Sequence, residues 1–190
     1  MLRWLVRALA ILVIAASVLV VLDFAELLVE VAPDDTASMA TTIPACDGRV
    51  LAQGLSYRIG DPSPPDVVAV HAAVTETGKV VPDPDATDRT LVLRVAAGPG
   101  DTIVGRAGTV FVNEIKFDDI RTKPFPAVKV PNGQYYLLGD NRSAALDSRT
   151  FGPVLRDSIF AKVFAVYWPI RDITFRLGQF TGAPPGRIDC

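Results

Sequence analysis

A chain of 190 residues has room for one domain of ordinary size and a short anchor or tail. Its formal net charge is −2, from 19 basic and 21 acidic residues, and no segment interleaves basic with aromatic side chains, which argues against nucleic acid as a partner. The single histidine and the two cysteines, Cys46 and Cys190, have no metal-ligand spacing, so we expect neither a metal ion nor a cofactor. The cysteines either pair in an exported domain or remain free thiols.

The first predicted element is an apolar segment at the N-terminus. Residues 8–22 carry no charge, and extension back to Trp4 gives a segment close to the roughly 20 residues that a helix needs to cross a bilayer. Arg3 and Arg7 lie at its start and only acidic residues follow it closely, so the positive-inside rule places the N-terminus in the cytoplasm. Residues 1–22 are therefore predicted to be the cytoplasmic end and transmembrane anchor of a single-pass protein of the cytoplasmic membrane.

A cleaved signal peptide is the alternative, because residues 38–40 (Ser-Met-Ala) offer small side chains at alternate positions. Against it, the gap from Leu22 to Ala40 is long for a cleavage site, and apolar residues recur at helical spacing within it. We therefore expect a retained anchor, followed by an amphipathic juxtamembrane segment over residues 23–35.

After Pro33 the pattern changes to short strands and turns, with 15 prolines and 14 glycines in the whole chain. The sequence predicts a mostly β fold, a twisted antiparallel β-sheet in an extracytoplasmic domain over residues 36–172. It also predicts a hairpin near Asn113, a loop over residues 75–88 and a disordered tail over residues 173–190. The expected strands are residues 66–71, 90–96, 109–112, 114–117, 134–138 and 158–168, with proline clusters at 62–65, 82–84 and 124–126 outside them.

Residues 139–152 form a dense polar segment directly after the expected strand 134–138. The segment contains two Asp, two Arg, an Asn and two Ser. Opposite charges this close can form bidentate carboxylate–guanidinium pairs, which hold a loop in one geometry. A solvated polar turn is the simpler interpretation, and only a match to a known family argues against it.

Five segments, in one order along the chain, resemble the sequence boxes of the bacterial type I signal peptidases. Residues 38–43 (Ser-Met-Ala-Thr-Thr-Ile) resemble the Ser-Met-x-Pro-Thr-Leu box, with Thr41 where proline is usual. Residues 139–149 resemble Gly-Asp-Asn-Arg-x-x-Ser-x-Asp-Ser-Arg. The other three are residues 65–68 (Pro-Asp-Val-Val), 93–101 (Leu-Arg-Val-Ala-Ala-Gly-Pro-Gly-Asp) and 167–169 (Tyr-Trp-Pro). These peptidases are membrane-anchored serine endopeptidases that remove signal peptides outside the cytoplasmic membrane.

The resemblance implies a serine nucleophile and an oxyanion hole. Ser38 matches the nucleophile, whose hydroxyl is weak unless a base takes its proton. Thr36 matches a hydroxyl that would donate to the oxyanion together with the Ser38 backbone N–H. The resemblance also implies a salt-bridged frame beneath the nucleophile, formed by Asp140, Asn141, Arg142, Asp147, Ser148 and Arg149.

The family's general base is missing at its usual position. Leu93 occupies the place of the lysine, and leucine has no proton chemistry. Arg94 cannot replace the base, because a guanidinium does not lose its proton in proteins and strand alternation turns Arg94 to the opposite face. Ala145 occupies the place of the serine that orients the lysine. Base and orienting hydroxyl are thus both replaced by apolar residues.

A substitute base would have to come from elsewhere in the chain. Lys79 lies in the expected loop over residues 75–88, which would have to fold back over Ser38. His71 ends the strand before the one that carries Leu93. For both, we expect a solvated side chain, with the role of substitute base as the alternative.

Two functions follow from the resemblance. One is a signal peptidase I-type serine endopeptidase that acts on exported preproteins, with small residues at the −1 and −3 positions before the cut. The other is a catalytically inactive relative that binds or positions exported or surface-assembly proteins. Preproteins or signal peptides and the lipid bilayer are the expected partners, and the sequence leaves the oligomeric state open.

Overall fold

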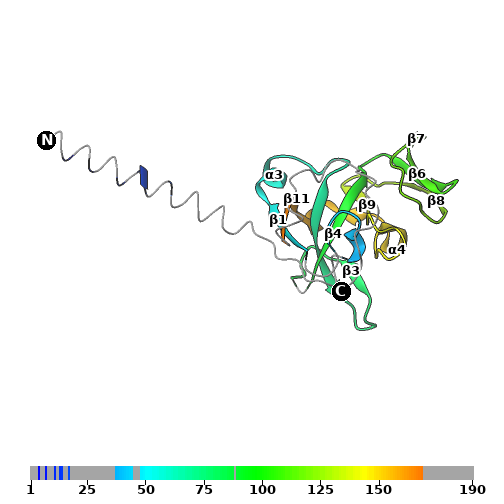
Figure 1. Ribbon diagram of the computed structural model, residues 1–190, viewed down its shortest axis with the longest axis horizontal. Coiled ribbons are helices and arrows are strands. Elements are labelled where there is room, and N and C mark those ends of the chain that lie inside the picture. Colours follow the sequence, from blue (N-terminus) through cyan, green and yellow to red (C-terminus); the bar gives the residue numbers. More distant parts are fainter. Residues whose placement is uncertain are drawn as a thin grey trace.

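The computed structural model describes residues 37–44, 48–87 and 89–168, together with positions 4, 7, 11, 13, 14 and 17 (Figure 1). The expected juxtamembrane segment, the expected tail, Thr36 and both cysteines lie outside the described residues. Most of the expected anchor does as well. In the part of the chain that is described, no helix has the length and apolar character needed to cross a bilayer.

A seven-stranded antiparallel sheet forms the larger part of the domain (Figure 1). Its strands follow the order β1-β11-β2-β4-β9-β10, and β3 pairs with the far end of β2. They are β1 (Arg49–Gln53), β2 (Val67–Val74), β3 (Val80–Pro82), β4 (Arg89–Ala97), β9 (Gln134–Leu138), β10 (Val154–Leu155) and β11 (Ile159–Trp168).

A four-stranded antiparallel sheet, called the small sheet below, lies at one end of the domain (Figure 1). Its order is β7-β6-β5-β8, and its β6–β7 turn has positive φ at both Asn113 (49°) and Glu114 (66°). Two such residues make the type I′ turn that matches the twist of a hairpin, and the predicted hairpin is confirmed. The strands are β5 (Thr102–Arg106), β6 (Thr109–Val112), β7 (Ile115–Lys116) and β8 (Phe125–Lys129).

Four short helical turns complete the described fold. The 3-10 turn η1 (Ala37–Met39) precedes the large sheet, and α4 (Ser148–Phe151) follows the polar segment. The Asp147 carboxylate caps α4 by accepting a hydrogen bond from the Arg149 backbone N–H. The other two are α3 (Leu55–Ile59) and η2 (Arg156–Ser158).

Strand β4 runs through the centre of the domain and is buried on both faces from Leu91 to Ala97. On one face, Val92 packs in the apolar cluster that contains Met39 of η1. On the other, Leu91, Leu93 and Val95 pack against Leu137 and its neighbours. This alternation is the period-two pattern of a strand buried on both sides. It separates the environment of Leu93 from that of Met39.

All six predicted strands have counterparts, but two proline-containing segments were assigned wrongly. Residues 75–88 do not form one loop, because β3 lies within them and contains Pro82. Pro126 likewise lies inside β8. Both strands are edges among the described residues, where β3 pairs with β2 alone and β8 with β5 alone. Proline has no backbone N–H, but no ladder hydrogen bond is lost where that position of an edge strand faces away from its partner strand.

Candidate active site

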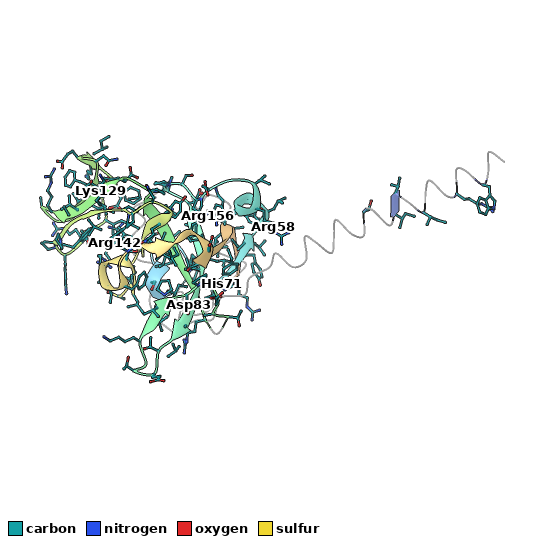
Figure 2. All side chains as sticks on the ribbon, turned by 180° about the vertical axis from the view of Figure 1, so that it is seen from behind. Arg58, His71, Asp83, Lys129, Arg142 and Arg156 are labelled. Atoms are coloured by element: carbon teal, nitrogen blue, oxygen red, sulfur yellow. The ribbon has the colours of Figure 1, made fainter. Side chains whose placement is uncertain are left out.

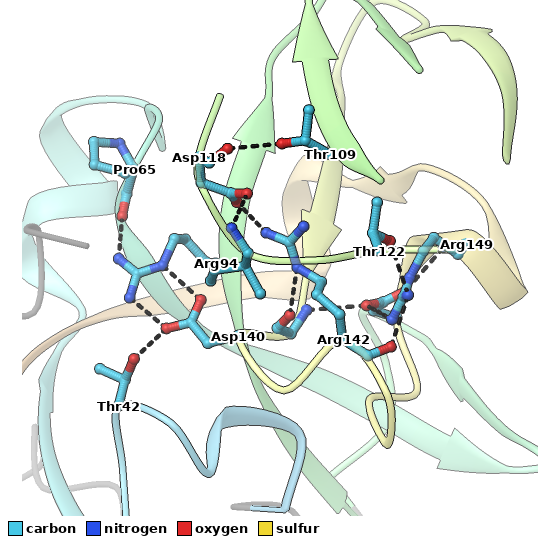
Figure 3. A network of polar contacts seen from close by, with 12 residues as sticks. Thr42, Pro65, Arg94, Thr109, Asp118, Thr122, Asp140, Arg142 and Arg149 are labelled. Atoms are coloured by element: carbon cyan, nitrogen blue, oxygen red, sulfur yellow. Dashed lines mark hydrogen bonds and ion pairs between the residues drawn. The ribbon is translucent and has the colours of Figure 1, made fainter. Parts of the chain in front are cut away.

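The polar segment begins where β9 ends, and a buried ion pair joins it to β4 (Figure 3). The Arg94 guanidinium donates to both oxygens of Asp140, from Nε at 2.8 Å and from Nη2 at 2.6 Å. Each side chain is only 1% exposed. Arg94 Nη1 donates to the Pro65 carbonyl at 2.9 Å, and the Thr42 hydroxyl donates to Asp140. These extra bonds offset the desolvation of the two charges.

Asn141, which follows Asp140 in the chain, holds the segment that carries Ser38. The Asn141 backbone N–H donates to the Ser38 carbonyl at 3.0 Å. The Asn141 side-chain amide donates to the Ala37 carbonyl at 3.1 Å. The Asp140 N–H lies 3.4 Å from the Met39 sulfur, and Met39 is fully buried. Three successive residues around Ser38 are therefore held by two successive residues of the polar segment, and Ser38 itself is half-buried.

Gly139 allows this close approach. A Cβ at position 139 would lie 2.3 Å from Ala145 Cβ and 2.6 Å from the Ser38 carbonyl oxygen, far inside contact distance. Only glycine fits between the two chains without a shift of the backbone. Ser38 and Ala145 thus flank the same residue, although they are far apart in the sequence.

Two further arginines hold the polar segment. Arg142 Nε donates to the Gly139 carbonyl at 2.9 Å, and its Nη2 pairs with the buried Asp118. Burial raises the pKa of Asp118, and the Arg142 guanidinium opposes that rise. Arg149 forms a two-pronged pair with Asp147, at 2.8 and 2.7 Å.

Ser148 completes the predicted frame. Its hydroxyl accepts a hydrogen bond of 2.9 Å from the Leu137 backbone N–H in β9. The structure thus brings five of the six predicted frame residues together in one network with the backbone around Ser38, and Ser148 binds the strand that leads into it.

Leu93 lies in an apolar cluster, and Ala145 lies against Gly139 in the polar segment. Leu93 is 1% exposed and lies in the cluster formed with Val68, Val95 and Leu137. The N–H of Ala145 donates to the Asn141 carbonyl at 2.9 Å, so its position follows from the turn that holds Ser38.

Neither candidate for a substitute base faces Leu93. His71 stacks on Phe160, with ring centroids 4.0 Å apart, and burial lowers its pKa. Alternation along β2 turns His71 to the face opposite Val68, the register partner of Leu93. Lys79 is exposed in the β2–β3 turn, where its N–H donates to the Thr75 hydroxyl at 3.0 Å. Figure 2 shows His71 near Asp83, at the base of that hairpin, whereas Arg142 lies toward the small sheet.

Sequence reasoning missed three parts of this network: the structural role of Arg94, the Thr42 hydroxyl and Asp118. A signal existed for Arg94, since a charged residue in the middle of an apolar strand needs a buried partner. Nothing local marked Asp118, which lies among other polar residues. Among the described residues, no group of three or more His, Cys, Asp or Glu side chains could hold a metal ion.

Comparisons with known proteins agree with the motif pattern. A family model described as signal peptidase, peptidase S26, matches residues 1–168. A probable signal peptidase I-2 from Synechocystis sp. is 32% identical over 140 residues, which is 71% of this chain and 61% of that protein. A signal peptidase I from Leptolyngbya laminosa is 27% identical over 177 residues, covering 90% of this chain and 82% of the relative.

Two further matches cover smaller shares of this chain. A chloroplastic thylakoidal processing peptidase 1 from Arabidopsis thaliana is 30% identical over 142 residues, 70% of this chain and 40% of its own. A crystal structure of a signal peptidase I from Enterococcus faecalis aligns with a TM-score of 0.41 and 25% identity, over 53% of this chain and 95% of that one. The chain therefore spans between two fifths and four fifths of the length of these three sequence relatives.

Proposed function

Because this chain belongs to the peptidase S26 family of signal peptidases, we propose that it acts on the signal peptides of exported preproteins, with Ser38 as nucleophile. Thr36 and the Ser38 N–H would form the oxyanion hole. The domain would work at the outer face of the cytoplasmic membrane, with the N-terminus inside.

The observation that carries the proposal is the fixed position of the Ser38 segment. Asn141 binds the carbonyls of Ala37 and Ser38, and the Arg94–Asp140 pair anchors Asn141 from the next position. A nucleophile must be held close to its working geometry, and misplacement of about 1 Å can cost about a hundredfold in rate. A solvated surface turn would need no such frame.

A strand edge without a β9 partner beside this segment supports a peptide as the ligand. Strand β4 pairs with β9 only from Arg94 onward, so residues 89–93 pair with β2 alone among the described strands. An extended peptide can add to such an edge through main-chain hydrogen bonds. The edge leads directly to Leu93, the position of the family's base.

The described residues at the N-terminus support the membrane anchor. All six are helical, and the Ser17 hydroxyl donates back to the Val13 carbonyl at 2.8 Å, which satisfies a polar group within an apolar helix. Four apolar side chains of this group are more than half exposed, as expected of a helix whose surroundings are lipid: Trp4, Ile11, Val13 and Ile14.

A catalytically inactive, peptide-binding relative is the second candidate, and the apolar pair Leu93 and Ala145 favours it. A positioned acid–base group contributes about 10²–10⁴ in rate. The oxyanion hole and binding alone still leave about 10³–10⁴ over water. Without a base, Ser38 would therefore react slowly, whereas binding at the β4 edge would be unaffected.

A preprotein cleavage assay separates the two candidates. The assay compares the full-length wild type with Ser38→Ala and Leu93→Lys, each in detergent micelles. Cleavage by the wild type that Ser38→Ala abolishes would establish the peptidase and rule out the inactive relative. No wild-type cleavage, with a gain in Leu93→Lys, would show an intact frame that lacks only its base.

Leu91→Lys is the matched control for the gained lysine. Leu91 lies two residues before Leu93, on the same face and in the same buried cluster. A lysine there meets a similar desolvation penalty, but its strand position is about 7 Å away. Equal cleavage by the Leu91 and Leu93 variants would contradict the assignment of the base position. The double variant Leu93→Lys/Ala145→Ser should exceed Leu93→Lys, since it also restores the orienting hydroxyl.

A further inference from the structure

The connecting segment, residues 117–124 between β7 and β8, reaches from the small sheet to the polar segment (Figure 3). Its Asp118 side chain is 0% exposed and accepts from Arg142 Nη2. The small sheet holds Asp118 in place, because the Thr109 hydroxyl of β6 donates to its carbonyl at 2.8 Å. The Ile120 N–H also donates to its carboxylate at 3.0 Å. Asp118 is therefore a buried charge fixed by the small sheet.

A second contact runs parallel to the first. The Thr122 N–H donates to the carbonyl of Gly108, in the β5–β6 turn, at 3.1 Å. The Thr122 hydroxyl lies 3.3 Å from Arg149 Nη1, which also donates to the Arg142 carbonyl at 2.8 Å. Arg149 also donates to the Asp147 carboxylate from its other two guanidinium nitrogens, Nε and Nη2. The connecting segment thus contacts both arginines of the polar segment.

The contacts made by Asp118 and those made by Thr122 both lead, through the two arginines, to Gly139. Arg142 donates to the Gly139 carbonyl at 2.9 Å, and Asp147 accepts from the Gly139 N–H at 3.0 Å. The connecting segment contacts Arg142, which holds the Gly139 carbonyl, directly. It reaches Asp147, which holds the Gly139 N–H, through Arg149. Gly139 lies directly against the Ser38 carbonyl oxygen. A shift of Gly139 would be transmitted to Ser38 by contact.

We propose that Asp118 is a positioning residue, through which the small sheet sets the place of Gly139 and hence of the Ser38 segment. Asp118 has no contact with a reacting group; it acts through Arg142. The physical basis is the forked guanidinium, which binds Asp118 with one nitrogen and the Gly139 carbonyl with another, and so fixes both in one plane. The catalytic role of Ser38 rests on the proposed function, but the link from Asp118 through Arg142 and Gly139 to the Ser38 segment does not.

Hydrogen–deuterium exchange of the full chain in detergent micelles tests the link without any need for activity. Asp118→Asn removes the charge and keeps the shape. We expect the amides of Gly139 and Asn141 to exchange about tenfold faster or more, while amides of β2 and β4 keep their wild-type rates. Asp119→Asn is the matched control, since Asp119 is the next residue but is 91% exposed, and it should change neither set.

Arg142→Lys provides a second, independent variant. It keeps the positive charge, but a single ammonium cannot reproduce the forked contact to Asp118 and Gly139. The same two amides should accelerate. The proposal is overturned if these amides keep their rates in both variants, or if every protected amide accelerates equally, which would report a general loss of stability.

Binding of a synthetic peptide with small residues at the −1 and −3 positions is measured in parallel. If Asp118→Asn speeds exchange at Gly139 and Asn141 alone and also weakens peptide binding, both the positioning role of Asp118 and the proposed function are supported. A wild type that neither binds nor cleaves the peptide would remove the proposed function, and the exchange rates would still decide the role of Asp118.

Discussion

The buried pair of Arg94 and Asp140 makes a quantitative prediction about stability. Asp140 accepts two hydrogen bonds from Arg94 and one from Thr42, and both members of the pair are 1% exposed. Replacing Asp140 by leucine leaves the guanidinium buried without its counter-ion. Loss of one partner of a buried ion pair costs about 3–5 kcal/mol. Arg94→Met should cost a similar amount, because it strands the carboxylate.

The double variant Arg94→Met/Asp140→Leu should be more stable than either single variant. An apolar pair of similar volume replaces a buried ion pair at little net cost. The remaining losses are the partners of the Thr42 hydroxyl and of the Pro65 carbonyl, about 1–3 kcal/mol each. Thermal unfolding followed by circular dichroism measures these differences. For a chain of this size, 1 kcal/mol shifts the midpoint by about 2–4 °C, so each single variant should melt roughly 6–20 °C below the wild type.

The result that would refute this reasoning is additivity. If the double variant lost the sum of the two single losses, the residues would act independently, and the pair would not be the unit that holds the polar segment to β4. A loss below about 1 kcal/mol for Asp140→Leu alone would also contradict it, since an exposed pair behaves in that way.

Two further predictions concern a neighbouring hydroxyl pair and the histidine. The Thr41 hydroxyl is buried without a hydrogen-bond partner among the described residues. Thr41→Val should therefore stabilise the protein by about 1 kcal/mol in urea unfolding, whereas Thr42→Val, which loses a bond to a carboxylate, should destabilise it by about 1–3 kcal/mol; equal effects would argue against the assigned contacts. Burial lowers the pKa of His71 below its usual value of about 6.5, so the unfolded chain binds the proton more tightly. The stabilising contribution of neutral His71 is complete above pH 6.5 and is lost as the pH falls from there toward the lower, folded-state pKa. His71→Phe keeps the stack on Phe160 and should flatten this part of the stability profile; an unchanged slope would assign the dependence to other groups.

The polar segment holds the Ser38 backbone, and the position that the family resemblance assigns to the base is a buried leucine. All the predicted frame residues except Ser148 take part in the network that holds the Ser38 segment. Leu93 lies in an apolar cluster and Ala145 lies beside Gly139. Framing and proton transfer are separate requirements, so one can persist where the other is absent. Under the proposed function, the frame supports binding of a peptide at the β4 edge. The presence or absence of a proton acceptor decides whether Ser38 cleaves that peptide.

Local patterns predicted the elements whose physics is local. The apolar run of residues 90–96 predicts a buried strand because alternate side chains meet a core on both faces, and β4 confirms it. Two strand-like runs that meet near Asn113 predict a hairpin, and the structure shows the positive φ values at Asn113 and Glu114 that its turn requires. Short strands such as β1, β5 and β8 were missed, since five residues are too few for a period-two pattern to stand out. The frame residues were predicted only through the family resemblance.

The amino-acid sequence by itself determined six of the strands, the family boxes and the leucine at position 93, because each of these is written in neighbouring residues. Only the tertiary structure decided which charges pair. Arg94 finds Asp140 46 positions away, and Arg142 finds Asp118 24 positions away, through strand register and the packing of the two sheets. A carboxylate at Asp118 looks like any other in the sequence. Its burial against Arg142, which makes it part of the Ser38 frame, exists only once the small sheet has docked, because desolvation is a property of the folded surroundings.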